Sequence, residues 1–310
     1  MTTRLVMALR RVGGGLVVVW VSATIAFLAV RLVPGDPVDT MLGIHAQVSD
    51  HIKDGIRADL GLDRPLYEQY ALFLGRLLRG DLGTSYQLRK PVTEVLGEQL
   101  GSTLQLTGLA MAIAIVLAVG LALVVRRRAA RAALSATELI VVAAPTFFTG
   151  LLLLSVFGFQ LGWFPVLSSG RFEALILPAF TLALPVAAIL GQVLRQGVDA
   201  AAREPFMLTA LARGATPARL HIRHGFRHGA PGAVALGGYL LGSLLGGAVL
   251  VETVFARPGL GRVALRAILD RDMPVVVGIV VLSAVVFSVV NLLVDLAVGA
   301  LDPRTRGGRR

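Results

Sequence analysis

Few residues in this chain have a type and spacing that could do chemistry. A phosphate-binding loop needs a lysine directly after a glycine-rich turn, and neither lysine offers one, because Lys53 follows Ile52 and Lys90 precedes Pro91. The chain has no cysteine, which excludes thiolate metal sites and disulfides. No nucleophile–base constellation indicates a catalytic centre. We therefore expect no catalytic residue, no metal and no cofactor on this chain, and any ATP hydrolysis must come from a partner.

The histidines form one pattern that deserves a chemical interpretation. His221, His224 and His228 recur at i, i+3 and i+7, so they share one face of a helix. A metal site there would lack nearby carboxylates, and the H-E-x-x-H motif of metalloproteases is absent. The pattern favours a basic helix at the membrane surface over a metal site.

Three carboxylates lie within long apolar runs: Glu138, Glu252 and Asp295. Ionisable groups inside a membrane are costly and often mark ion pathways, so an ion-coupled secondary transporter is one hypothesis. Each of the three lies close to an end of its run, near the membrane interface, where a satisfied interfacial carboxylate is the simpler interpretation. No relay of Asp, Glu or His crosses the apolar core.

The elements that carry these side chains are typical of a membrane protein. Of 310 residues, 55% are hydrophobic and 16% are charged, and the mean hydropathy is +0.75. Many of the glycines and prolines fall inside apolar runs, as in transmembrane helices. The net charge of +11 comes from arginines clustered between those runs, which is a topology signal and not a nucleic-acid surface. The sequence predicts an all-α, polytopic membrane protein with lipid around it and no nucleic-acid partner.

Six runs are long enough to cross a bilayer. We predict transmembrane helices over Val12–Leu32, Ser102–Val125, Ser135–Phe159, Ala174–Leu194, Ala233–Phe255 and Pro274–Ala300. Arg10 and Arg11 could mark an export signal, but the run that follows is too long and lacks a clear cleavage site, so a retained anchor is favoured.

The remaining segments complete the predicted organisation. Residues 1–11 form a short amino-terminal segment, and residues 12–32 form the first span. Residues 33–100 form a polar loop with short helices over Asp50–Leu60 and Pro65–Leu78. Residues 101–300 form the transmembrane core, which includes a polar segment at 195–232, and residues 301–310 form a basic tail.

The positive-inside rule orients the spans. Seventeen arginines lie in the amino terminus, the 126–131 loop, the 195–232 segment and the tail, all of which fall on one side if there are six spans. The long loop of residues 33–100 is net acidic and lies on the other side. We therefore predict that both termini face the cytoplasm, in the inner or plasma membrane of a bacterial cell.

The segment 195–232 is the longest polar stretch on the predicted cytoplasmic side. Ala200–Arg213 reads as a helix, Gly214 supplies a left-handed stop, and Pro217 can begin a second helix. A helix–turn–helix that projects from the membrane could dock into a groove on a partner. The alternative is a solvated loop that lies on the lipid headgroups.

Several stretches resemble the permease subunits of binding-protein-dependent ABC importers of the dipeptide, oligopeptide and nickel group. The stretch Leu208 to Gly214, followed by Arg223 and His224, is similar to the coupling motif of that superfamily, known as the EAA motif. Leu208 replaces a residue that is often Glu or Arg, and His228 stands where Asn is usual. The matching positions are Leu208, Thr209, Ala210, Ala212, Arg213, Gly214, Arg223 and His224.

Other stretches resemble features specific to this group. They are Arg31–Pro37, Leu60–Leu66, Gly80–Ser85, Glu252–Arg262, Asp270–Val275, Asn291–Leu296 and Leu301–Arg304, and they follow the expected order along nearly the whole chain. Glu252 and Asp295 fall inside matching stretches, where we expect structural roles before roles in the transport pathway.

The resemblance implies a type I ABC importer permease fold and a division of labour between subunits. A second homologous permease would complete the translocation path, which works by alternating access. Two cytoplasmic ATP-binding subunits, which hold ATP and magnesium, would receive the coupling segments. An extracytoplasmic substrate-binding protein would deliver short peptides, with nickel or another small solute as the alternative cargo.

Overall fold

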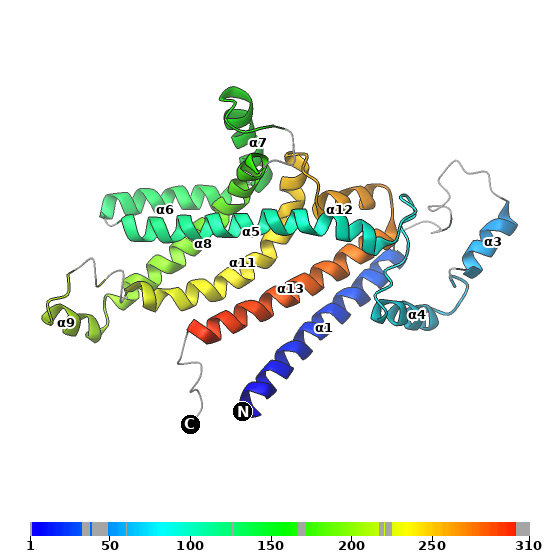
Figure 1. Ribbon diagram of the computed structural model, residues 1–310, viewed down its shortest axis with the longest axis horizontal. Coiled ribbons are helices and arrows are strands. Elements are labelled where there is room, and N and C mark those ends of the chain that lie inside the picture. The colour runs from blue at the N-terminus through cyan, green and yellow to red at the C-terminus, as the bar shows by residue number, and fades with distance from the viewer. Residues whose placement is uncertain are drawn as a thin grey trace. The chain divides into compact units, whose positions relative to one another are not determined.

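The computed structural model describes residues 2–32, 38, 49–59, 61–125, 127–166, 172–216, 220 and 225–301, and the statements below concern these residues. They are mostly helical, and an isolated bridge between Thr84 and Pro91 is the one β pairing among them. Figure 1 shows the helices in chain order: α1 (Thr2–Leu32), α3 (Asp50–Asp59), α4 (Leu66–Leu78), α5 (Val92–Val124), α6 (Arg128–Ala143), α7 (Thr146–Leu153), the π-helix η1 (Leu154–Gln160), α8 (Glu173–Ala201), α9 (Pro205–Ala212), α11 (Phe226–Val254), α12 (Leu260–Leu269) and α13 (Met273–Leu301). The predicted all-α class is confirmed.

Five described helices are long and apolar enough to cross a membrane. They are Arg10–Leu32, Val92–Val124, Glu173–Ala201, Gly229–Val254 and Met273–Leu296. Each overlaps one of the runs identified in the sequence. The two short helices predicted in the polar loop are also confirmed, as α3 and α4.

The predicted span Ser135–Phe159 is not one straight helix. α6 and the α7–η1 pair meet at an angle of 105°, so the sixth candidate span is a bent pair. The break lies at Ala144, whose ψ of 131° is extended, directly before Pro145. Proline has no N–H to donate and disfavours the helical conformation in the residue before it, which explains why the helix stops there.

The chain divides into two compact units, which we describe separately. The first contains residues 1–101 and 262–288. Its α1 and α4 are joined by a polar contact of 2.7 Å between the hydroxyls of Thr24 and Tyr70 and by stacking of Phe27 on Phe73, whose centroids are 5.3 Å apart. A Cβ at Gly278 of α13 would lie 2.5 Å from Val92 of α5, so glycine allows these two helices to approach closely.

The second unit contains residues 102–261 and 289–310, and α8 lies at its centre. α8 packs against α6, α7 and α11. Of the most apolar 18-residue stretch of α8, 72% is buried. Pro178 and Pro185 interrupt its backbone hydrogen bonds, which neighbouring helices make tolerable in a membrane span. The core cluster takes residues from α5, α8 and α11, including Leu106, Leu182 and Leu244.

Candidate functional site

The predicted coupling segment is built from two helices and not from one. The sequence predicted a helix over Ala200–Arg213, but α8 ends at Ala201 and α9 begins at Pro205. Glu204 is extended, with ψ of 143°, because it precedes a proline, and Pro205 occupies the first turn of α9, where its missing N–H costs nothing. The prediction of one continuous helix is therefore wrong at Pro205.

The predicted stop at Gly214 is confirmed. Gly214 has φ of +81°, a left-handed conformation, and its N–H donates to the Leu211 carbonyl at 2.9 Å. The N–H of Ala215 donates to the Ala210 carbonyl at 3.1 Å and closes the turn. A Cβ at Gly214 would meet no atom within 4 Å, so the glycine is needed for its backbone conformation and not for space.

α9 carries apolar side chains that are partly exposed. Phe206 and Leu211 are 41% and 48% exposed, whereas Met207 is 6% exposed and anchors the helix. Thr209, Ala212 and Arg213 are exposed and Ala210 is half-buried. Leu208 lies within α9, and Arg223 and His224 lie outside the described residues. The structure therefore presents positions 209–214 as one accessible surface, which we call the α9 surface.

Two ion pairs tie α6 to α8, the helix that leads into α9. The Arg195 guanidinium donates to the Glu138 carboxylate, and the two side chains are 8% and 5% exposed. Arg131 Nη1 donates to the two carboxylate oxygens of Asp199 at 3.0 and 3.2 Å. Glu138 therefore has a structural partner in Arg195, a residue to which the sequence had assigned no role.

Glu252 lies at the end of α11 and is fully buried. Its carboxylate accepts hydrogen bonds from Thr103 Oγ1 at 2.6 Å and from the Gly261 N–H at 2.8 Å. Thr103 Oγ1 in turn accepts from the Leu260 N–H at 2.8 Å. The carboxylate thus ties the loop after α11 to α5 and to the first turn of α12.

Two glycines make this arrangement possible. A Cβ at Gly259 would lie 2.2 Å from the Glu252 carboxyl carbon, and a Cβ at Gly261 would lie 2.3 Å from the Val249 Cα. Burial lowers the pKa of nearby Arg257, and the Glu252 carboxylate partly opposes this effect. The stretch Glu252–Arg262 is therefore held together by the Glu252 carboxylate and the backbone N–H of Gly261, and Gly259 and Gly261 leave the space that this contact needs.

A second buried carboxylate, Asp272, has a role that sequence reasoning missed. Asp272 is 3% exposed, and it accepts from the Ser85 hydroxyl and from the N–H groups of Tyr86 at 3.1 Å and Gln87 at 3.3 Å. Burial and the Asp272 charge raise the pKa of the Tyr86 phenol. Both partners fall within stretches that resemble the family, at Gly80–Ser85 and Asp270–Val275, which was the available signal.

The third carboxylate in an apolar run is Asp295. It lies half-buried on α13, next to Val294, whose side chain occupies the space where a Cβ of Gly238 would stand.

Known proteins are similar in sequence to this chain over almost all of its length. The family described as "Binding-protein-dependent transport system inner membrane component" matches residues 96–307, and the corresponding amino-terminal family matches residues 4–107. The glutathione transport system permease protein GsiC of Pectobacterium atrosepticum is 35% identical over 91% of this chain and 92% of that protein. GsiC of Escherichia coli strain K12 is 33% identical over 96% of this chain and 98% of that protein.

A solved structure supports the fold. The crystal structure of an amino acid ABC transporter with histidines matches 68% of this chain and 94% of that chain, with a TM-score of 0.50 and 19% identity. The family match, the relatives and the helical fold agree with one another. The chain belongs to the family of inner-membrane components of binding-protein-dependent transport systems, and it is a permease subunit of such an importer.

Proposed function

We propose that this permease imports short peptides, and that the α9 surface couples it to cytoplasmic ATPase subunits. The observation that carries the coupling role is the accessible α9 helix, with Phe206 and Leu211 exposed and Gly214 fixing its end. Exposed apolar side chains on a short, projecting helix are suited to a groove on a partner. The relatives named as glutathione transport permeases support a short peptide as the cargo.

In this proposal the chain works with three kinds of partner. A second homologous permease forms the other half of the path, two ATP-binding subunits hold ATP and magnesium, and an extracytoplasmic binding protein delivers the cargo. This chain itself binds no cofactor and does no catalysis. Both termini and α9 lie in the cytoplasm, and α3 and α4 lie outside.

The coupling mechanism follows from how α9 is connected. α8 leads into α9 through the turn at Ala202–Glu204, and two ion pairs lock α8 to α6. A displacement of α9 by closing ATPases would therefore move α6 and α8 as one body. That motion would open the path on the opposite side, and hydrolysis would reset it.

An ion-coupled secondary transporter is the competing class, and the surroundings of the carboxylates speak against it. Glu138 is paired with Arg195, and Glu252 is engaged by Thr103 and the Gly261 amide. Carboxylates held in this way stabilise the fold. Binding of a transported ion would have to break these hydrogen bonds and this ion pair.

The test is uptake into proteoliposomes that contain the complete complex. We expect a radiolabelled tripeptide and glutathione to accumulate only with the binding protein and with ATP inside, and nickel ions not to compete. Uptake of peptide without ATP under a proton or sodium gradient would overturn the proposal. Competition by nickel at the same site would replace the peptide with the metal as cargo.

A further inference from the structure

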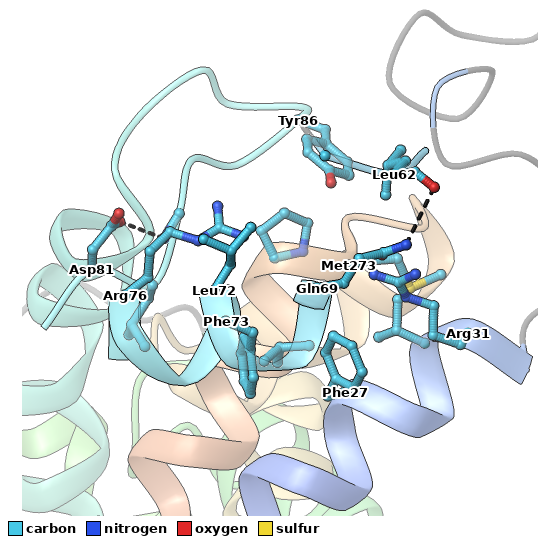
Figure 2. Close-up of a pocket in the computed structure, with 16 residues that line it drawn as sticks. Phe27, Arg31, Leu62, Gln69, Leu72, Phe73, Arg76, Asp81, Tyr86 and Met273 are labelled. Atoms are coloured by element: carbon cyan, nitrogen blue, oxygen red, sulfur yellow. Dashed lines mark hydrogen bonds between the residues drawn. The ribbon is translucent and has the colours of Figure 1, made fainter. Parts of the chain in front are cut away.

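A cavity of about 170 Å³ lies within the first unit, at the carboxyl end of α1. It is open to solvent on one side and is lined by α1, α4, the 81–86 loop and the start of α13 (Figure 2). This volume is several times the ~15 Å³ that one water requires, so it can take a small group or side chain. Its apolar lining residues include Phe27, Leu72, Phe73, Met273 and Val277.

Two arginines give the cavity a positive charge. In Figure 2, Arg76 and Arg31 lie on opposite sides, and Tyr86 lies above the space between them. Arg31 stacks over Phe27 with its guanidinium carbon 4.9 Å from the ring centroid, and neither arginine forms an ion pair with a described carboxylate. Asp81 also lines the cavity, but its carboxylate accepts from the Gly83 N–H at 2.8 Å.

The Tyr86 hydroxyl is a hydrogen-bond donor in this setting. Burial and the Asp272 carboxylate raise its pKa, and the charges of Arg76 and Arg31 only partly oppose that rise. The phenol therefore stays protonated at neutral pH.

Gln69 also lines the cavity. Its Nε2 donates to the carbonyls of Leu62 at 3.2 Å and Arg64 at 2.7 Å. Its Oε1 is buried and has no hydrogen-bond partner. A buried acceptor without a partner is unfavourable. Protein atoms cover Oε1, so it does not contribute to binding in the cavity.

We propose that this cavity binds the carboxyl-terminal residue of a short peptide. The carboxylate would lie between Arg31 and Arg76 and accept from the Tyr86 hydroxyl. An apolar last side chain would pack against Phe27 and Phe73. Arginine and a neutral phenol together select a carboxylate, and the apolar wall beneath them selects the residue that carries it. This inference rests on the proposed function and adds that the cargo needs a free carboxyl terminus.

The test compares a peptide acid with its amide. The complete complex is placed in phosphatidylcholine nanodiscs without binding protein, and equilibrium binding of labelled Ala-Ala-Phe and Ala-Ala-Phe amide is measured. We expect the acid to bind at least about tenfold more tightly than the amide, because the amide cannot form the charge-assisted contacts. Equal affinities for acid and amide would overturn the proposal.

Variants on α4 locate the binding. Arg76→Met should lower the affinity for the acid to that of the amide and leave the amide unchanged. Arg79→Met is the matched control, because Arg79 is exposed just after the same helix and does not line the cavity. If Arg79→Met weakens binding as much as Arg76→Met, a diffuse surface charge explains the effect and the cavity does not.

A lipid phosphate is the other source of an anion, and a second arm separates it from the peptide. The measurement is repeated in nanodiscs of phosphatidylcholine and phosphatidylglycerol in equal parts, with native mass spectrometry to count retained lipid. If phosphatidylglycerol displaces the acid and Arg76→Met releases that lipid, the site belongs to a headgroup and the peptide assignment fails. We expect no such displacement.

Uptake separates failure of this inference from failure of the proposed function. If the complex imports peptides with ATP while acid and amide bind alike, the cavity assignment fails and the function stands. If the acid binds in the predicted pattern but no peptide is imported, the binding result still supports the cavity and the proposed function fails.

Discussion

A single buried carboxylate, Glu252, sets the geometry of the loop after α11. A charge or even a neutral polar group at this depth is unfavourable unless hydrogen bonds satisfy it, and Thr103 and the Gly261 amide do so here. The same contacts hold three chain segments together. The residue therefore has a structural explanation, and ion transport is not needed to account for its position.

The close contact at Gly259 gives the first prediction. Gly259→Ala should destabilise the protein by about 1–3 kcal/mol, because its Cβ would overlap the Glu252 carboxyl group and force the loop to shift. Thermal unfolding of the purified complex measures this effect. Gly246→Ala is the control, since its Cβ would meet nothing within 4 Å. Equal midpoints for the two variants would contradict the role assigned to Glu252.

The Ser85–Asp272 hydrogen bond could not be predicted from one sequence, whereas the turn at Gly214 could. The stretches that contain Ser85 and Asp272 could be identified by their resemblance to the family. Their hydrogen bond joins residues 187 positions apart, and no local pattern predicts such a contact. By contrast, the left-handed stop at Gly214 was predictable, because glycine at the end of a helix has a local conformational cause.

At the scale of helices, the contact between α6 and α8 depends on charges in a nearly dry environment. The pair is formed by Arg195 Nη2 and Glu138 Oε2, whereas Glu138 Oε1 and Arg195 Nη1 have no hydrogen-bond partner. The pair is therefore the main compensation for burying both charges. A buried ion pair contributes little net stability, because burying both charges is costly. Loss of one member is nevertheless strongly destabilising, because the other charge stays buried without a partner.

We expect strong energetic coupling between the Glu138 and Arg195 side chains. Glu138→Gln and Arg195→Met should each destabilise the protein by about 3–5 kcal/mol, and the double variant should lose clearly less than the sum. Denaturant unfolding of the four proteins in detergent measures the cycle. Arg131→Met, which breaks the more exposed pair with Asp199, should cost about 1 kcal/mol or less. Additive effects of Glu138→Gln and Arg195→Met would show that the pair is not coupled.

The helices also show where sequence patterns stop being informative. Apolar runs gave the position of every span, because hydropathy and length are local properties. They did not give the 105° bend at Pro145 or the break at Pro205, because both prolines can be accommodated in or between helices. Packing decides which of these outcomes occurs, and packing was not visible in one sequence.

At the scale of the whole molecule, the proposed orientation can be tested without first removing native cysteines, since the chain has none. Arg79→Cys and Ala212→Cys replace exposed residues after α4 and in α9. We expect an impermeant maleimide to label Arg79→Cys in intact spheroplasts and to label Ala212→Cys only after permeabilisation. The reverse pattern would place the termini outside and contradict the coupling role of α9.

If α9 couples transport to ATP hydrolysis in partner subunits, a change to the turn that ends α9 should lower both activities together. ATP hydrolysis stimulated by the binding protein, and uptake, are compared for wild type, Gly214→Pro and Gly162→Pro in proteoliposomes. Gly162 is a matched control, because it too has a positive φ, of +63°, and open space around it, but it lies after η1.

We expect Gly214→Pro to lower stimulated hydrolysis and uptake together by at least about tenfold, because proline cannot adopt the left-handed turn that ends α9. Gly162→Pro should keep both activities, and Arg213→Glu should behave like Gly214→Pro. If Gly214→Pro inserts normally and retains stimulated hydrolysis coupled to uptake, α9 is not the coupling element.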